Sequence, residues 1–328
     1  MDRSAKIFIA GHRGLMGSAL VRNLQSQGYS NLLLRTREEL PLDDRGAVRQ
    51  FMETEHPEFV FLAAAKVGGI QANMNYPADF ILENLLIETA VIEGAYKAGV
   101  RRLLFLGSSC IYPRSSQQPI LESYLLTGSL ESTNRPYAIA KIAGVELCWS
   151  FNRQHGTRYL AAMPTNLFGL GDHYNPEMSH VIPALIYKFH LAKVRGEKEV
   201  KVWGTGAPRR EFLNSSEAAD ACVFLMNLPD DIFDSLTSRE DQAPLVNIGT
   251  GTDVTTRELA FLIADVVGLD ANIVFDYSRP DGTPRKLLDN SRLAELGWKA
   301  KGDLVSGLKE AYDDFRNRYP DSRKNVDL

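Results

Sequence analysis

The N-terminal segment constrains the fold of this chain more than any other. Residues 6–10 (Lys-Ile-Phe-Ile-Ala) have the apolar character of a buried strand, and Gly11, Gly14 and Gly17 follow at once. A helix is expected over about 18–28. Such glycines let backbone amides approach a pyrophosphate at a helix N-terminus, where the helix dipole favours anions. The spacing is G-x-x-G-x-x-G, and it predicts dinucleotide binding; the alternative is a turn that needs glycine only for its shape.

The end of the second predicted strand bears on the choice of cofactor. This strand, near residues 31–34, is followed by Arg35-Thr36-Arg37. An NAD site usually places an acidic residue here to bind the ribose 2′-hydroxyl. The guanidinium groups of Arg37, and of Arg13 in the glycine loop, suit a 2′-phosphate instead, because they can hold it by paired hydrogen bonds. The sequence therefore predicts NADP(H), with a solvated basic turn as the alternative.

Further strands and helices alternate along the chain. Residues 59–65 and 102–106 are apolar runs typical of buried strands, and apolar residues recur through a predicted helix over 77–99. Strands that alternate with helices predict a parallel α/β sheet. Ser108 comes directly after the strand that ends at Leu106, and parallel sheets bind ligands at the carboxyl ends of their strands. The long helices suggest a homodimer, because they carry enough apolar surface for the sheet and a neighbouring subunit.

Tyr137 and Lys141 are four residues apart in a segment that Pro136 opens as a helix. Residues at this spacing lie on one helix face. An ammonium group near a phenol lowers its pKa, so we expect Tyr137 to exchange a proton with a carbonyl oxygen near neutral pH. Ser108, some thirty residues earlier, is the expected hydroxyl that shares this carbonyl.

Composition excludes several classes of protein. The chain has 328 residues, 44% of them hydrophobic and 24% charged, as in ordinary globular proteins. A net charge of -4 gives no footprint for nucleic acid or for an anionic membrane. The N-terminus runs into a strand without a signal-peptide core, so we expect a cytoplasmic protein. Cys110, Cys148 and Cys222 lack metal-ligand spacing, which predicts free thiols and no metal site.

Longer motifs resemble the GDP-L-fucose synthase family, a branch of the extended short-chain dehydrogenases/reductases. The resemblance covers essentially the whole chain. The motifs that carry it are Gly11-His-Arg-Gly14, Ala63-Ala-Ala-Lys-Val-Gly-Gly-Ile70, Gly107-Ser-Ser-Cys-Ile-Tyr-Pro113, Pro136-Tyr-Ala-Ile-Ala-Lys-Ile-Ala143, Met163-Pro-Thr-Asn-Leu167, Ser179-His-Val-Ile-Pro183 and Pro280-Asp-Gly-Thr-Pro-Arg-Lys286.

The resemblance implies a bifunctional enzyme that epimerises GDP-4-keto-6-deoxy-D-mannose at C3 and C5 and then reduces its 4-keto group with NADPH. It also implies an α/β fold in which a Rossmann-type doubly wound parallel sheet is joined to a smaller, discontinuous α/β substrate-binding domain. We expect the NADP-binding domain at 1–170 plus 212–250, and the nucleotide-sugar-binding domain at 171–211 plus 251–328. The alternative is another nucleotide-sugar epimerase or dehydratase that holds NAD tightly.

The resemblance also assigns roles to individual residues. Cys110 and His180 become the acid/base pair of epimerisation, and Ser108 and Tyr137, with Lys141, act on the carbonyl. The GDP portion is assigned to Lys188, Trp203, Arg210 and Lys286. Cofactor binding is assigned to Gly11, His12, Arg13, Gly14, Leu15, Met16, Gly17, Arg37, Leu106, Gly107, Ser108, Ser109, Lys141, Pro164, Thr165, Asn166, Leu167 and His180.

One segment departs from the family pattern. Relatives usually carry a His-Val-Asp-Asp type sequence where this chain has Asn214-Ser215-Ser216-Glu217. Asn214 and Glu217 still have the spacing of a capping box, so we expect a helix to begin here. Any contact that the family makes through the usual histidine or aspartates is not expected in this chain.

Overall fold

A parallel sheet organises the larger part of the molecule. The structure is a computed structural model that describes residues 1–174, 179–278 and 281–319, so Pro280 of the last motif lies outside it. Within these residues, six strands pair in the order β10-β5-β4-β3-β1-β2, and every pairing is parallel. The strands are β1 (Ile7–Ala10), β2 (Leu32–Leu33), β3 (Phe59–Leu62), β4 (Arg102–Leu106), β5 (Tyr159–Pro164) and β10 (Leu245–Ile248).

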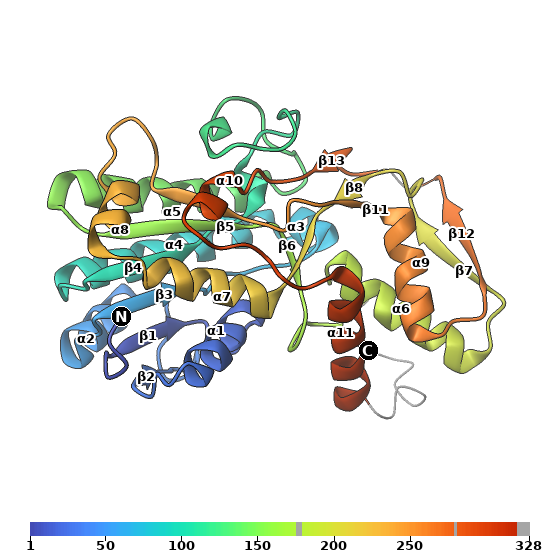
Figure 1. Ribbon diagram of the computed structural model, residues 1–328, viewed down its shortest axis with the longest axis horizontal. Coiled ribbons are helices and arrows are strands. Elements are labelled where there is room, and N and C mark those ends of the chain that lie inside the picture. The colour runs from blue at the N-terminus through green and yellow to red at the C-terminus, as the bar shows by residue number, and fades with distance from the viewer. Residues whose placement is uncertain (175–178, 279–280, 320–328) are drawn as a thin grey trace.

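Helices cover both faces of this sheet (Figure 1). On one face α1 (Leu15–Ser26), α7 (Ser215–Met226) and α8 (Asp230–Thr237) share a buried apolar cluster with the strands. On the other face α2 (Arg45–Glu55), α4 (Pro77–Lys97) and α5 (Arg135–His155) form a second cluster. The strands read as continuous apolar runs because helices bury them on both sides. The predicted doubly wound Rossmann-type sheet is confirmed.

The strand order places a crevice beside β1. The chain leaves β1 for β2 on one side and returns to β3 on the other, which is the switch point where such sheets bind ligands. Gly11 has φ +84°, and a Cβ there would lie 2.7 Å from Ala64 Cα, after β3. A Cβ on Gly17 would overlap the Gly11 carbonyl. Both glycines are therefore required by the close packing of the loop.

A smaller part lies beside the carboxyl end of the sheet (Figure 1). Its helices α6 (Val181–Arg195), α9 (Thr256–Val267) and α11 (Leu304–Arg318) share a separate apolar core. Two small sheets complete it, one with β7 (Glu199–Trp203) beside β12 (Asn272–Asp276), the other with β8 (Arg209–Arg210) between β11 (Val254–Thr255) and β13 (Arg285–Lys286). β6 (Asn166–Phe168) pairs with β9 (Phe212–Asn214) where the chain passes between the two parts.

The chain crosses between the two parts more than once. After β13 it returns to the larger sheet, where Leu288, Leu293 of α10 (Ser291–Glu295) and Trp298 belong to the buried clusters of that sheet. These residues fall within the predicted second domain, whose boundaries stay a prediction. The described helices include none with both the length and the apolar character needed to cross a membrane.

Two helices of the larger part begin with side-chain caps. The Asp44 carboxylate accepts hydrogen bonds from the Gly46 and Ala47 amides at the start of α2. Asn214 caps α7 in the same way, accepting from the Ser216 amide. Glu217 differs from the expected capping box, because its carboxylate accepts the amides of Lys301 and Gly302 instead. The atypical segment thus begins the helix and also links it by hydrogen bonds to residues 301–302.

Candidate active site

A large cavity lies between the carboxyl edge of the sheet and the smaller part. Its volume is about 1910 Å³. The cavity is lined by the glycine loop, the residues that follow β3, β4 and β5, the start of α5, and the facing side of α6, β8 and β13. All the predicted site residues line it except Gly17, which packs beneath the loop against Gly11.

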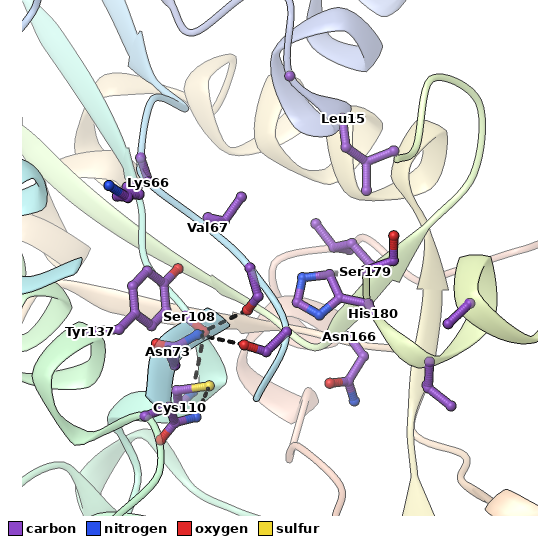
Figure 2. Close-up of a pocket in the computed structure, with 18 of the residues that line it drawn as sticks. Leu15, Lys66, Val67, Asn73, Ser108, Cys110, Tyr137, Asn166, Ser179 and His180 are labelled. Atoms are coloured by element: carbon purple, nitrogen blue, oxygen red, sulfur yellow. Dashed lines mark hydrogen bonds between the residues drawn. The ribbon is translucent and has the colours of Figure 1, made fainter. Parts of the chain in front are cut away.

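The glycine loop forms one wall. Residues 11–16 line the cavity, and Leu15, the first residue of α1, points into it in Figure 2. No acidic side chain lies in the first turn of α1, so the positive end of the helix dipole faces the cavity unopposed. The Nδ1 atom of His12 is buried without a hydrogen-bond partner among the described residues. This wall therefore offers donors to an anionic group.

Two arginines stand at the rim of this wall. Arg37 is 75% exposed, and its only ion pairs among the described residues are loose ones, 3.7 Å to Asp43 and 3.9 Å to Glu83. Arg13 is exposed and lines the same cavity. Arg35 is engaged elsewhere, because its guanidinium lies 2.8 Å from the Glu55 carboxylate. Arg37 and Arg13 are thus the guanidinium groups that can turn to a ligand.

Ser108, Tyr137 and Lys141 meet below this wall. Ser108 follows β4, its Oγ accepts a hydrogen bond from the Cys110 amide, and its side chain is near enough to the Tyr137 phenol to lower the pKa of that phenol slightly. The Lys141 ammonium lies 6.0 Å from the centre of the Tyr137 ring. A lowered pKa was expected for Tyr137. In this structure its pKa is raised instead, because burial disfavours the phenolate and the charges of Cys110 and Glu88 add to the effect.

A carboxylate behind Lys141 adds to the effect of burial. The Lys141 Nζ is 3.2 Å from the Glu88 Oε1 and donates a hydrogen bond of 2.9 Å to the Leu106 carbonyl. Its charge is therefore offset by Glu88 rather than directed at the phenol. The sequence did offer a signal for Glu88, since a charged residue on the apolar face of a predicted buried helix is expected to have a partner.

Cys110 lies at the same end of β4, in the short 3₁₀ turn Ser109–Ile111. Its Sγ, drawn in Figure 2, accepts a hydrogen bond from the Asn134 Nδ2 at 3.1 Å, and the Lys286 Nζ lies 3.6 Å away. The ammonium of Lys286 and the amide of Asn134 are thus the polar groups in contact with this sulfur. Asn134 was not predicted, and its place just before α5 carried no pattern that could have revealed it.

His180 stands on the opposite side of the cavity from Ser108, Cys110 and Tyr137 (Figure 2). It precedes α6 and its ring is exposed to the cavity. The surrounding walls lower the pKa of its imidazole by desolvation, and the positive charge of Lys286 lowers it further. A group that can exchange protons therefore faces the thiol across the cavity.

The smaller part supplies the far end of the cavity. Lys188 of α6, Trp203 of β7 and Arg210 of β8 all line it. The Lys188 Nζ donates to the Lys201 carbonyl, and burial lowers its pKa. Cations beside an aromatic ring can hold a nucleoside diphosphate through ion pairing and stacking.

The remaining predicted cofactor contacts lie between these walls. The cavity is lined there by Leu106, Gly107, Ser109, Pro164, Thr165, Asn166 and Leu167. Among the described residues, no group of three or more His, Cys, Asp or Glu side chains could hold a metal ion. The chemistry of the cavity is thus that of a phenol, a thiol, an imidazole and several cations around a space large enough for two nucleotides.

Such a cavity, set on a Rossmann-type sheet with a tyrosine and a lysine one helical turn apart, defines a class of nucleotide-dependent enzymes that act on a carbonyl. Residues 7–237 match the family described as "NAD dependent epimerase/dehydratase family". The chain belongs to this family.

Curated and solved relatives are similar over nearly the full chain. "GDP-L-fucose synthase 1" of Arabidopsis thaliana is 56% identical over 95% of this chain and 93% of its own length. "GDP-L-fucose synthase" of Escherichia coli is 52% identical over 94% of this chain and 96% of its own. The Campylobacter jejuni structure described as "MlghC, GDP-mannoheptose C4 reductase" with NADP bound is 40% identical, with a TM-score of 0.86 over 96% of this chain and 99% of that one.

Proposed function

We propose that this protein converts GDP-4-keto-6-deoxy-D-mannose to GDP-L-fucose, first by epimerisation at C3 and C5 and then by NADPH-dependent reduction of the 4-keto group. One observation carries the proposal: Cys110 and His180 face each other across the cavity, with Ser108 and Tyr137 beside the thiol. A reductase alone needs no such opposed pair. The relatives named GDP-L-fucose synthase, at 56% and 52% identity, support the substrate.

Epimerisation needs proton transfer at two carbons that the 4-keto group acidifies. The Cys110 thiolate, stabilised by the Lys286 ammonium 3.6 Å away, takes the proton from one face of the sugar. His180 returns a proton from the other face. The enolate charge develops on the C4 oxygen, where the hydroxyl groups of Ser108 and Tyr137 donate hydrogen bonds. Burial and the charge of Lys286 both lower the pKa of His180, and the diphosphate of the substrate would offset part of the second effect.

The glycine-loop wall fits NADPH. Its close-packed turn would admit a pyrophosphate against the α1 N-terminus. The His12 Nδ1, which has no hydrogen-bond partner in the described part of the chain, and the exposed Arg37 would be available to the adenosine half. When bound, this cofactor supplies the hydride. Tyr137 then gives its proton to the C4 oxygen, and its raised pKa means that the phenol carries that proton at neutral pH. Lys141, which lines the cavity, would hold the neighbouring ribose.

The GDP portion of the substrate is assigned to Lys188, Trp203 and Arg210 at the far end of the cavity. Lys286 was predicted to join them. Its place beside Cys110 favours a contribution to the thiolate as well. This arrangement supports the predicted division into a cofactor domain and a sugar-nucleotide domain, with the return of 288–298 to the larger sheet as a refinement.

A homodimer through α4 and α5 belongs to the same proposal. Leu82 and Leu86 of α4 and Ile139 of α5 are large apolar side chains left exposed, at 58%, 41% and 42%. A second copy that covers these helices would remove this surface from water. A cytoplasmic location, without nucleic-acid or membrane partners, also stays a prediction.

The deciding experiment follows proton exchange and reduction separately. Purified protein is incubated in heavy water with GDP-4-keto-6-deoxymannose, with and without NADPH, and the products are analysed by NMR. The wild type should exchange the C3 and C5 protons without cofactor and form GDP-L-fucose with NADPH. Cys110→Ala should nearly lose exchange while still reducing the unepimerised ketone, and His180→Ala should slow exchange.

Cys222→Ala is the matched control, because this thiol is buried in α7 away from the cavity. Reduction by the wild type without any proton exchange would contradict the epimerase step. Exchange by Cys110→Ala at the wild-type rate would mean that another group is the base. An enzyme that copurifies with tightly held NAD and leaves NADPH unoxidised would favour the alternative, a redox-neutral epimerase or dehydratase.

A further inference from the structure

Glu88 is a fully buried carboxylate with no role so far. It lies on α4, faces α5, and its side chain is 0% exposed. The Lys141 Nζ, 3.2 Å from Oε1, is its ion-pair partner, and neither carboxyl oxygen has a hydrogen bond among the described residues. A buried charge is costly unless it is paired. The structure therefore keeps this carboxylate where its main interaction is with the lysine of the candidate active site.

Neighbouring groups fill the space around the Glu88–Lys141 ion pair. A Cβ on Gly144 would overlap the Phe105 ring and lie 2.9 Å from the Glu88 Oε2. The Phe105 ring lies on another side, with its centre 4.6 Å from the Lys141 Nζ. Burial among apolar side chains strengthens the interaction between the two charges.

Few other charged groups act on Tyr137. Cys110 faces the phenol from the turn after β4, Glu88 from α4 and Lys141 from α5. Lys286 and Asn134 lie on the far side of Cys110 and contact its sulfur. The balance of charge around the phenol therefore depends on whether the Lys141 ammonium is compensated.

We propose that Glu88 is a positioning residue that compensates the charge of Lys141 and so keeps Tyr137 protonated as the acid of carbonyl reduction. The role of Glu88 in reduction rests on the proposed function. The arrangement of charges around Tyr137 does not depend on it. Burial raises the pKa of Glu88 to about 7, with the Lys141 charge opposing part of that rise. The compensating negative charge is thus present above neutral pH, the range in which a tyrosine beside an uncompensated lysine would begin to ionise.

The test is a spectroscopic titration that needs neither substrate nor cofactor. Phenolate absorbance is followed from neutral pH to about 10.5, around the ordinary tyrosine value of about 10, in pairs of variants that differ only by Tyr137→Phe. Wild type and Tyr137→Phe should give the same curve, because Tyr137 does not ionise in this range. At the alkaline end, the absorbance of Glu88→Gln should be higher than that of Glu88→Gln/Tyr137→Phe by the contribution of one phenolate. Equal curves in that second pair would overturn the proposal.

A pH profile gives the consequence for reduction. In Glu88→Gln the alkaline limit of kcat/KM should move to lower pH by at least about one unit, whereas a purely structural defect would lower the whole profile without moving it. Glu122→Gln is the matched control, since it places the same amide at another buried carboxylate that does not line the cavity. Its titration and pH limit should equal those of the wild type.

Thermal unfolding shows which variants are folded. Should Glu88→Gln not fold, Glu88→Asp keeps the charge one methylene further from Lys141 and should move the alkaline limit in the same direction by less. An unmoved limit in folded Glu88→Asp would then overturn the proposal. If the wild type reduces no substrate, only the proposed function fails, because the titration still reports on Glu88 and Tyr137.

Discussion

Lys286 and Cys110 are 176 residues apart in the chain, yet the ammonium nitrogen of one lies 3.6 Å from the sulfur of the other. The ammonium comes from β13 of the smaller part and the thiol from the end of β4. The candidate base of epimerisation and the group that supports its charge therefore belong to different parts of the molecule, and the site is complete only when both are folded together.

This contact predicts how fast Cys110 reacts with iodoacetamide. Lys286→Met removes the cation that lies 3.6 Å from the sulfur, so alkylation should slow by about tenfold. Mass spectrometry can follow Cys110 alone in the folded protein, because Cys148 and Cys222 are 0% exposed. Lys188→Met is the control, since that lysine lines the same cavity but contacts the Lys201 carbonyl. An unchanged rate in Lys286→Met would show that the ammonium does not support the thiolate.

The rim arginines predict a preference for NADPH over NADH. A charged hydrogen bond contributes about 1.5–3 kcal/mol, so kcat/KM should differ by about tenfold or more between the cofactors. Arg37→Ala should reduce the difference mainly through weaker NADPH binding, because Arg37 is loosely paired in the free protein. Arg49→Ala removes an exposed arginine from α2, outside the cavity, and should leave the ratio unchanged. Similar kcat/KM values for both cofactors in the wild type would refute the assignment.

Tyr137→Phe tests the acid at the carbonyl. The variant keeps the ring and removes the proton, so reduction should fall at least about a hundredfold. NADPH should still bind, as fluorescence titration would show, because the glycine loop and Lys141 are unchanged. Turnover close to that of the wild type would rule out Tyr137 as the proton donor.

Asp172 predicts a pH dependence of stability. Burial raises its pKa from the ordinary 3.8 to about 7. The folded protein therefore holds this proton more tightly than the unfolded chain does. This tighter binding stabilises the folded protein by at most about 4 kcal/mol. The stabilisation is fully present below about pH 4 and is lost as the pH rises through about 7. Asp172→Asn keeps the shape and removes the charge, so it should raise the free energy of unfolding at pH 8 and change it little at pH 4.

Denaturant titrations at the two pH values check this. Asp270→Asn is the control, because that carboxylate is fully exposed. Equal effects of Asp172→Asn at both pH values would contradict the assignment.

The exposed apolar residues of α4 and α5 predict the oligomeric state. Leu86→Lys should shift the protein from dimer to monomer in size-exclusion chromatography with light scattering, because it places a charge in the proposed contact. Phe261→Lys alters an apolar side chain of α9 with comparable exposure, 48% against 41% for Leu86, and should leave the dimer intact. A monomeric wild type would contradict the proposal.

The sequence predicted most of the larger fold, because its strands are apolar runs bounded by glycine, serine or proline and its helices carry recognisable caps. The cavity residues of the glycine loop, Ser108, Tyr137 and Lys141 follow from those same patterns, whereas Cys110 was assigned through the resemblance to a family. The electrostatic contacts between distant segments could not be predicted from these patterns. The pairing of Glu88 with Lys141, and the approach of Lys286 and Asn134 to Cys110, depend on how helices and loops pack in three dimensions.

The direction in which the pKa of Tyr137 shifts could not be predicted from the Tyr137–Lys141 pair alone. Spacing on one helix placed a cation near the phenol, and from that we expected a lowered pKa. Burial of the phenol reverses the outcome, and a carboxylate from another helix adds to this by pairing with the lysine. Local patterns identify the reacting groups, while their protonation is set by the whole packed site.

Gly144 has a consequence for how freely this protein can change over evolutionary time. The absence of a side chain there lets α4 and α5 approach until the Phe105 ring and the Glu88 carboxylate fill the space. An alanine, which most helix positions accept, would place its Cβ too close to both groups. Position 144 is therefore expected to resist substitution as strongly as the reacting residues do, although it would never touch the substrate. A mutational scan read out by growth or activity would show it as a sensitive position remote from the chemistry.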